Sequence, residues 1–130
     1  GANAVRLYGN DLDGDHGAFL DEAQAQGLQV IGGISDLPYL HMNGSCVETN
    51  FNCYRQIRDK YLDILKSGFL MANKSYHLAV RTVVLMNEPD LKFTPITKHR
   101  QWCKAMVSAV DGLVDAEHLA GVTGPRPNLT

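Results

Sequence analysis

The chain has 130 residues, of which 45% are hydrophobic and 20% charged, and its formal net charge at pH 7 is −2. This length is enough for one ordinary domain with a real core. The twelve lysines and arginines are scattered, which argues against a nucleic-acid partner, and no apolar segment approaches the roughly 20 residues that a membrane-spanning helix needs.

The first part of the chain predicts a strand, a short helix and a second strand. Residues 3–8 alternate apolar and polar side chains, which is typical of a strand. Asp13 or Asp15 is expected to cap the following helix, which ends at Gly27. Residues 28–34 predict the second strand, whose two glycines indicate close approach of another backbone or of a ligand.

The middle of the chain predicts a long loop, a strong helix and a third strand. The loop covers residues 35–50, and loops of this length are often functional. The third strand begins at Val80 and should end at or just before Glu88, because Pro89 has no N–H to give to a sheet. Between them, apolar residues recur at helical spacing: Tyr54, Ile57, Tyr61, Leu65 and Phe69.

The last part predicts a loop over residues 91–96, a helix that Thr97 caps, and the opening of a fourth strand at residues 128–130. Cys103 is expected to be buried on that helix. The residues expected to face the core there are Trp102, Met106, Val110, Leu113 and Val114.

The alternation of strands and helices predicts an α/β fold with a parallel sheet. No strand is followed by a glycine-rich phosphate-binding motif, so a nucleotide-binding fold of that kind is excluded. A flavodoxin-like sheet fits the periodicity, but polar residues at a strand end fit a β/α barrel better. Since a whole barrel needs roughly 250 residues, we expect residues 1–130 to form a single incomplete domain, about half of a (β/α)8 TIM barrel.

Glu88 is the first candidate for chemistry. It follows an apolar strand, and in β/α folds the carboxyl ends of the strands are where ligands bind. Partial desolvation there would raise the pKa of a glutamate toward the range of a general acid. Asn87 can donate hydrogen bonds to a bound hydroxyl. The alternative is that residues 87–90 form only a turn, with Glu88 paired to a surface lysine.

The Asn87–Glu88 pair resembles the acid/base signature of the clan of retaining β/α-barrel glycosidases. Residues 5–9, followed by Ala23, Gly27 and residues 30–34, are similar to the second and third strands of glycoside hydrolase family 17, which comprises β-1,3-glucanases and related transglycosylases. The family 72 transglycosylases share much of this layout. The resemblance covers the region from a second strand to the start of a fifth.

The resemblance implies a role for each matching residue. Glu88 would be the proton donor, Asn87 would contact the sugar 2-hydroxyl, and Tyr8 would lie beside the same ring, with Arg6 on its strand. Retention needs a second carboxylate about 5–5.5 Å from the first. The clan carries it at the seventh strand, which is expected outside this chain. Asp11 and Asp36 also follow strands but do not occupy that position.

The sequence also contains glycosylation sequons, a pair of nearby cysteines and five histidines. Asn43 and Asn73 open N-glycosylation sequons, while a third sequon, at Asn128, falls on a predicted inner strand and is discounted. Cys46 and Cys53 could close a small disulfide ring or remain free thiols. His41 in the loop could line a sugar subsite or serve only in packing. The five histidines lack metal-ligand spacing, so neither a metal nor another cofactor is expected.

Two functions follow from these observations. The first is a glycoside hydrolase or transglycosylase acting on β-glucan, with a polysaccharide or oligosaccharide as substrate. The alternative is a non-catalytic cell-surface or matrix glycoprotein that keeps a barrel-derived sugar-binding scaffold. Both imply a secreted or cell-surface location. Because half a barrel exposes sheet edges, association with further chain segments or other subunits is expected.

Overall fold

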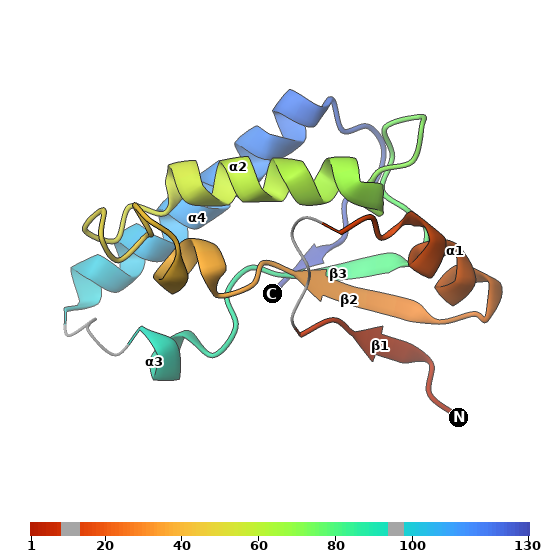
Figure 1. The fold of residues 1–130 in the computed structure, drawn as a ribbon, viewed down its shortest axis with the longest axis horizontal. Helices are drawn as coiled ribbons and strands as arrows, with labels where there is room; N and C mark the ends of the chain where they lie inside the picture. The colour runs from red at the N-terminus through yellow and green to blue at the C-terminus, as the bar shows by residue number, and fades with distance from the viewer. Residues whose placement is uncertain (9–13, 94–97) are drawn as a thin grey trace.

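The computed structural model describes residues 1–8, 14–93 and 98–130, and its central element is a parallel sheet (Figure 1). The strands lie in the order β1-β2-β3-β4, and all three neighbouring pairs are parallel. The α/β class with a parallel sheet is therefore confirmed. The strands are β1 (Ala4–Arg6), β2 (Gln29–Gly33), β3 (Val80–Val84) and β4 (Asn128–Leu129).

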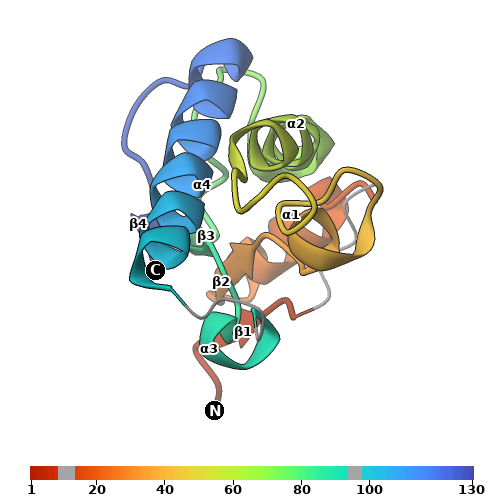
Figure 2. The same cartoon turned by 90° about the vertical axis from the view of Figure 1, so that its left-hand side faces the viewer.

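Helical segments connect the strands: α1 (Gly17–Ala25), η1 (Leu37–His41), α2 (Tyr54–Ile64), η2 (Leu65–Phe69), α3 (Pro89–Lys92) and α4 (His99–Ala120). The long helices α2 and α4 lie on one side of the sheet, with α1 on the same side near the amino end of β2 (Figures 1 and 2). Side chains alternate across a strand, and Val30 and Val83 are buried toward the helices. The opposite side, which no helix covers in the described part of the chain, is called the uncovered face; Arg6, Ile31, Thr82 and Val84 lie on it.

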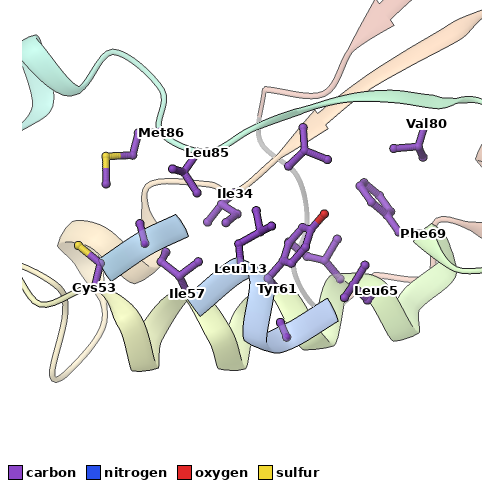
Figure 3. Packing of buried hydrophobic residues seen from close by; sticks show 14 of the residues in the cluster. Ile34, Cys53, Ile57, Tyr61, Leu65, Phe69, Val80, Leu85, Met86 and Leu113 are labelled. Atoms are coloured by element: carbon purple, nitrogen blue, oxygen red, sulfur yellow. The ribbon is translucent and has the colours of Figure 1, made fainter. Parts of the chain in front are cut away.

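The predicted apolar stripe of the middle helix forms the centre of the core (Figure 3). Ile57, Tyr61, Leu65 and Phe69 are all fully buried, whereas Tyr54 is only half-buried. The stripe continues from α2 into the wider turn of η2. Within η2 the backbone leaves helical geometry at Gly68, which takes a positive φ of 107°. Periodicity therefore identified the correct face of this segment.

The predicted core face of α4 was correct in part, since Leu113 is buried and Met106 and Val110 pack against the core from half-buried positions. Of the five expected residues, Leu113 is buried, but Val114 is 39% exposed and the other three are half-buried. Cys103 is also exposed, not buried. The buried face instead consists mainly of small residues: Ala105, Ala109, Gly112, Ala116 and Ala120. A Cβ on Gly112 would lie 2.4 Å from the carbonyl oxygen of Tyr54, so α4 packs too closely on α2 for larger side chains.

Several predicted element boundaries differ from the structure, and the expected loop over residues 35–50 contains η1. β3 ends at Val84, four residues before Glu88, because its hydrogen-bonded partner β2 ends at Gly33. Part of the expected loop over residues 91–96 belongs to α3. Helix α1 begins after His16, and Asp15 accepts a hydrogen bond from the Gly17 N–H at 2.8 Å. Asp11, Asp13 and Thr97 lie outside the described residues.

The two glycines of β2 permit the close approach that the sequence predicts. A Cβ on Gly32 would lie 2.6 Å from the ring of Phe69, and one on Gly33 would lie 2.6 Å from the carbonyl oxygen of Val84. Because Gly32 has no side chain, the ring of Phe69 packs directly against β2. The second brings β3 close to β2 near the end of the strands.

Cys46 and Cys53 form a disulfide, as the first of the two predicted alternatives states. Both residues are fully buried, and their Cα atoms are 4.5 Å apart. Cys53 is the residue that precedes α2, and its N–H donates to Ser108 Oγ of α4 at 2.9 Å. The disulfide thus ties the long loop after β2 to the point where α2 meets α4.

Reduction of this disulfide is expected to lower the free energy of unfolding by roughly 2–3 kcal/mol, because the unfolded chain regains the entropy of an open loop. Urea denaturation with and without dithiothreitol measures the change. The Cys103→Ser variant is the control, since it lacks the free thiol and should show the same difference. An unchanged midpoint after complete reduction would contradict this account.

Candidate functional site

Polar side chains gather at the carboxyl edge of the sheet. Arg6, at the end of β1, donates from Nη2 to Asn87 Oδ1 at 2.5 Å, although 81 positions separate the two residues. Arg6 ends β1 and Asn87 follows β3, and these two strands are not neighbours because β2 lies between them. Since β2 ends in glycine, no side chain at Gly33 stands between Arg6 and Asn87. The sheet therefore joins two of the predicted site residues directly.

Tyr8 belongs to the same group. Its ring lies under the Arg6 guanidinium, with Cζ 4.2 Å from the ring centroid, and its hydroxyl accepts a hydrogen bond from Arg6 Nη1 at 3.2 Å. Tyr8 remains 70% exposed. Arg6 is thus held by both the amide and the phenol, and the open face of Tyr8 is available to stack on a ligand.

Glu88 follows Asn87 in an unusual backbone conformation. Its φ is 46° and its ψ 52°, which places a non-glycine residue in the left-handed region at a cost of about 1–3 kcal/mol. Such conformations concentrate at functional sites. The Asn87 amide lies 3.5 Å from Glu88 Oε2. Glu88 is exposed, however, so its carboxylate is not desolvated in the described structure, in contrast to the prediction.

Asp36 lies at the same edge, after β2, but its carboxylate already has a partner. It forms a salt bridge with Lys92 of α3, and both side chains are about 30% exposed (31% for Lys92 and 29% for Asp36). The pKa of Lys92 is raised mainly by this hydrogen bond, and the charge of Glu88 adds to the shift. Lys92 is therefore a cation near both carboxylates. The alternative in which Glu88 pairs with a surface lysine is not seen within residues 1–8, 14–93 and 98–130, where Glu88 forms no salt bridge.

The loop after β2 packs against the carboxyl edge of the sheet through Tyr39. Tyr39 is buried and its hydroxyl donates to the Leu85 carbonyl oxygen at 2.6 Å. Burial, and then the charge of Asp36, raises the pKa of Tyr39 well above its ordinary value, so its hydroxyl stays protonated. His41 is exposed and does not line the hollow described next.

A hollow of about 420 Å³ opens on the uncovered face at this edge. This volume falls within the range of small-molecule sites, about 300–1,000 Å³. Glu88 is the single carboxylate among its described lining residues. These residues are Arg6, Ile31, Thr82, Val84, Met86, Asn87, Glu88 and Thr130.

The two predicted glycosylation sequons lie on the surface. Asn43 and Asn73 are both exposed. The Oδ1 atom of Asn73 accepts hydrogen bonds from the Ser75 N–H at 3.0 Å and from Ser75 Oγ at 2.8 Å, so the two polar residues of that sequon already face each other. The discounted third sequon, at Asn128, begins in β4.

Sequence reasoning missed a buried polar cluster at the other end of the sheet. Glu117 of α4 is 2% exposed and accepts hydrogen bonds from Tyr76 at 2.6 Å and from Arg126 at 2.5 Å. Because Tyr76 uses its proton on Glu117, the Tyr61 hydroxyl donates to Tyr76 at 2.8 Å. Burial raises the pKa of both tyrosines. One feature of the sequence indicates that Glu117 is buried: it follows the buried Leu113 by four residues, so the two lie on the same face of α4.

Neither a metal-ligand cluster in the described residues nor a similar known protein identifies the function of this site. No cluster of three or more metal-ligating side chains occurs within residues 1–8, 14–93 and 98–130. Among the described helices, none combines the length and apolarity required to cross a membrane. Comparisons of the chain with protein-family models, with curated proteins and with solved structures found no match.

Proposed function

We propose that this chain forms about half of a (β/α)8 barrel and belongs to a glycoside hydrolase or transglycosylase acting on β-1,3-linked glucan. The observation that carries the proposal is the convergence of Arg6, Tyr8, Asn87 and Glu88 at the carboxyl edge of a parallel sheet. In β/α barrels the active site lies at this edge. Helices on one face only, with an uncovered second face, are also what part of a barrel wall presents.

Each residue has a role in the proposed reaction. Glu88 donates its proton to the leaving glycosidic oxygen and later takes a proton from the incoming water or sugar hydroxyl. Asn87, oriented by Arg6, donates its amide to the 2-hydroxyl of the sugar at the cleavage site. Tyr8 stacks beside that sugar. Retention of configuration also requires a nucleophilic carboxylate about 5–5.5 Å from Glu88, which further barrel strands would supply.

The direct test combines binding and turnover. The protein is assayed together with the further barrel strands that would supply the nucleophile, since turnover requires both carboxylates. Oligosaccharides of β-1,3-linked glucose are titrated into it by calorimetry, and the release of reducing ends or of transfer products is followed by chromatography. Cellulose-derived β-1,4 oligosaccharides serve as the comparison substrate. The proposal expects binding and turnover with a preference for the β-1,3 linkage. An absence of both would overturn it.

Arg6→Ala is expected to weaken oligosaccharide binding by about tenfold or more, because the variant releases Asn87 and Tyr8 from their bound geometry and hydrogen bonds to charged groups contribute about 1.5–3 kcal/mol. Calorimetric titration measures the change. The matched control is Arg55→Ala, which removes the same charge from a side chain that is 84% exposed on α2. Equal affinities of the two variants would show that Arg6 does not organise the site.

One observation favours the alternative function, a non-catalytic cell-surface or matrix glycoprotein with a sugar-binding scaffold. Glu88 is exposed, and the hollow beside it has no second carboxylate among its described lining residues. The same titration separates the alternatives, since this function predicts binding without turnover, with or without Glu88.

Both alternatives include a secreted or cell-surface location. The disulfide Cys46–Cys53 is compatible with an oxidising compartment, and Asn43 and Asn73 are exposed for glycosylation. A loss of mass from the native protein after peptide N-glycosidase treatment tests this part of the proposal. The uncovered face further supports association with other barrel segments or subunits.

A further inference from the structure

A second hollow, of about 490 Å³, lies at the amino edge of the sheet, at the opposite end of the strands from Glu88. It is formed by the starts of β2, β3 and β4 together with the segment before β4. The polar residues that line it and carry the argument are Gln29, Ser75, His77, Arg81, Arg126 and Asn128.

The charge of this hollow is positive. Arg81 and Arg126 line it, and no aspartate or glutamate is among its described lining residues. His77 is already occupied: its Nδ1 accepts the Ala79 N–H at 3.2 Å, and its Nε2 lies 3.1 Å from Asp21 Oδ1. The two guanidinium groups are therefore the charged groups that a ligand would meet, and that of Arg126 is already paired with the Glu117 carboxylate behind it.

Arg81 reaches the hollow because the sheet is irregular at this point. Val80 pairs with Val30 and Thr82 pairs with Ile31, so Arg81 is an extra residue in β3, a β-bulge. Bulges redirect the side chain of the extra residue and occur frequently beside functional sites. Arg81 is exposed and forms no salt bridge within residues 1–8, 14–93 and 98–130.

Arg126 is oriented before any ligand binds. Its Nε donates to Glu117 at 2.5 Å, and Glu117 is buried and held by Tyr76. This contact fixes the guanidinium plane while the terminal nitrogens can still donate. Because the side chain is 51% exposed, a ligand can reach those nitrogens from solvent.

We propose that this hollow binds the doubly charged oxyanion group of a small soluble ligand, a phosphate or a sulfate. Arg81 supplies a positive charge without a salt bridge in the described residues, and Arg126, although paired with Glu117, keeps terminal N–H donors for the anion. Each guanidinium group presents the planar fork of N–H donors that suits phosphate-type oxygens. Ser75, Gln29 and Asn128 provide neutral hydrogen-bonding groups around the same space. The volume exceeds that of the anion alone, so the ligand carries a further polar part.

Titration of inorganic phosphate, and separately of sulfate and acetate, tests this site by two-dimensional NMR of the backbone amides at constant ionic strength. The expected result is saturable binding of phosphate or sulfate, with shifts confined to residue 29 and to residues 75–81 and 125–128, and binding of acetate at least tenfold weaker. Phosphate compared with sulfate identifies which group the site prefers. A linear, non-saturating response, or acetate binding equal to that of both dianions, would overturn the proposal.

The variants make the test residue-specific. Arg81→Ala is expected to weaken phosphate binding at least tenfold, and Arg81→Gln should give a similar loss because it keeps polarity but removes the charge. Arg55→Ala changes the net charge equally at a distant exposed site and should bind as the unaltered protein does. Unchanged thermal midpoints confirm that the variants are folded. Phosphate binding that survives both Arg81 substitutions would sink the assignment.

Discussion

In the complete barrel that supplies the nucleophile, Glu88→Gln is expected to lower turnover of natural β-glucan by about 10²–10⁴-fold while oligosaccharide binding stays close to that of the unaltered protein. Glutamine has the same shape as glutamate and can adopt the same left-handed backbone conformation at φ 46°. It cannot donate a proton to a leaving glycosidic oxygen. The loss should therefore appear in kcat, because an interaction made only in the transition state is removed.

An aryl β-glucoside with an acidic phenol as leaving group sharpens this measurement. Such a leaving group departs without protonation, so Glu88→Gln should lower kcat/KM, which reports the first step, much less for the aryl glucoside than for glucan. Asp90→Asn is the matched control, since it removes a neighbouring exposed carboxylate that does not line the hollow. Equal losses with both substrates, or full activity of Glu88→Gln on glucan, would reject the acid/base role.

Arg126→Ala is expected to lower the free energy of unfolding by about 3 kcal/mol. Removing one partner of a buried ion pair costs about 3–5 kcal/mol, because the remaining charge is left without compensation in the interior. Here the remaining charge is Glu117, which is 2% exposed. The lower end of the range is expected because Arg126 is itself 51% exposed, so water partly replaces its guanidinium.

A second substitution separates the charge from the packing. In the Arg126→Ala/Glu117→Gln double variant no buried charge remains, and the amide oxygen can still accept the Tyr76 hydroxyl. The double variant should therefore be more stable than Arg126→Ala alone in urea denaturation. Additive losses, or a loss below about 1 kcal/mol for Arg126→Ala, would place the pair among ordinary surface salt bridges.

Strong periodicity made the strands and the middle helix predictable. The stripe from Ile57 to Phe69 is both apolar and regular, and those residues are fully buried. Helix α4 was harder, because small residues form its buried face. Ala109 and Gly112 carry little hydrophobic signal of their own, and only contact with α2 shows why larger residues are excluded. The larger residues Val107 and Val114 consequently point to solvent.

The candidate site was predictable in part. Parallel strands end at one edge, so Arg6, Tyr8, Asn87 and Asp36 were expected there, and the structure places them there. Their pairing was not predictable. The contact of Arg6 with Asn87 depends on strand order and register across β2, and the Asp36–Lys92 salt bridge depends on a four-residue helix that has no periodic signal. Exposure of Glu88 likewise depends on what surrounds it in space.

The separation between the buried core and the polar edge has a consequence for how this fold can diversify. Tyr8 is 70% exposed, and Arg6 and Glu88 are exposed as well, whereas the core lies between the sheet and its helices. Substitutions at exposed positions usually change stability by about 0.5 kcal/mol or less. Residues at this edge can therefore be exchanged while the same scaffold continues to fold.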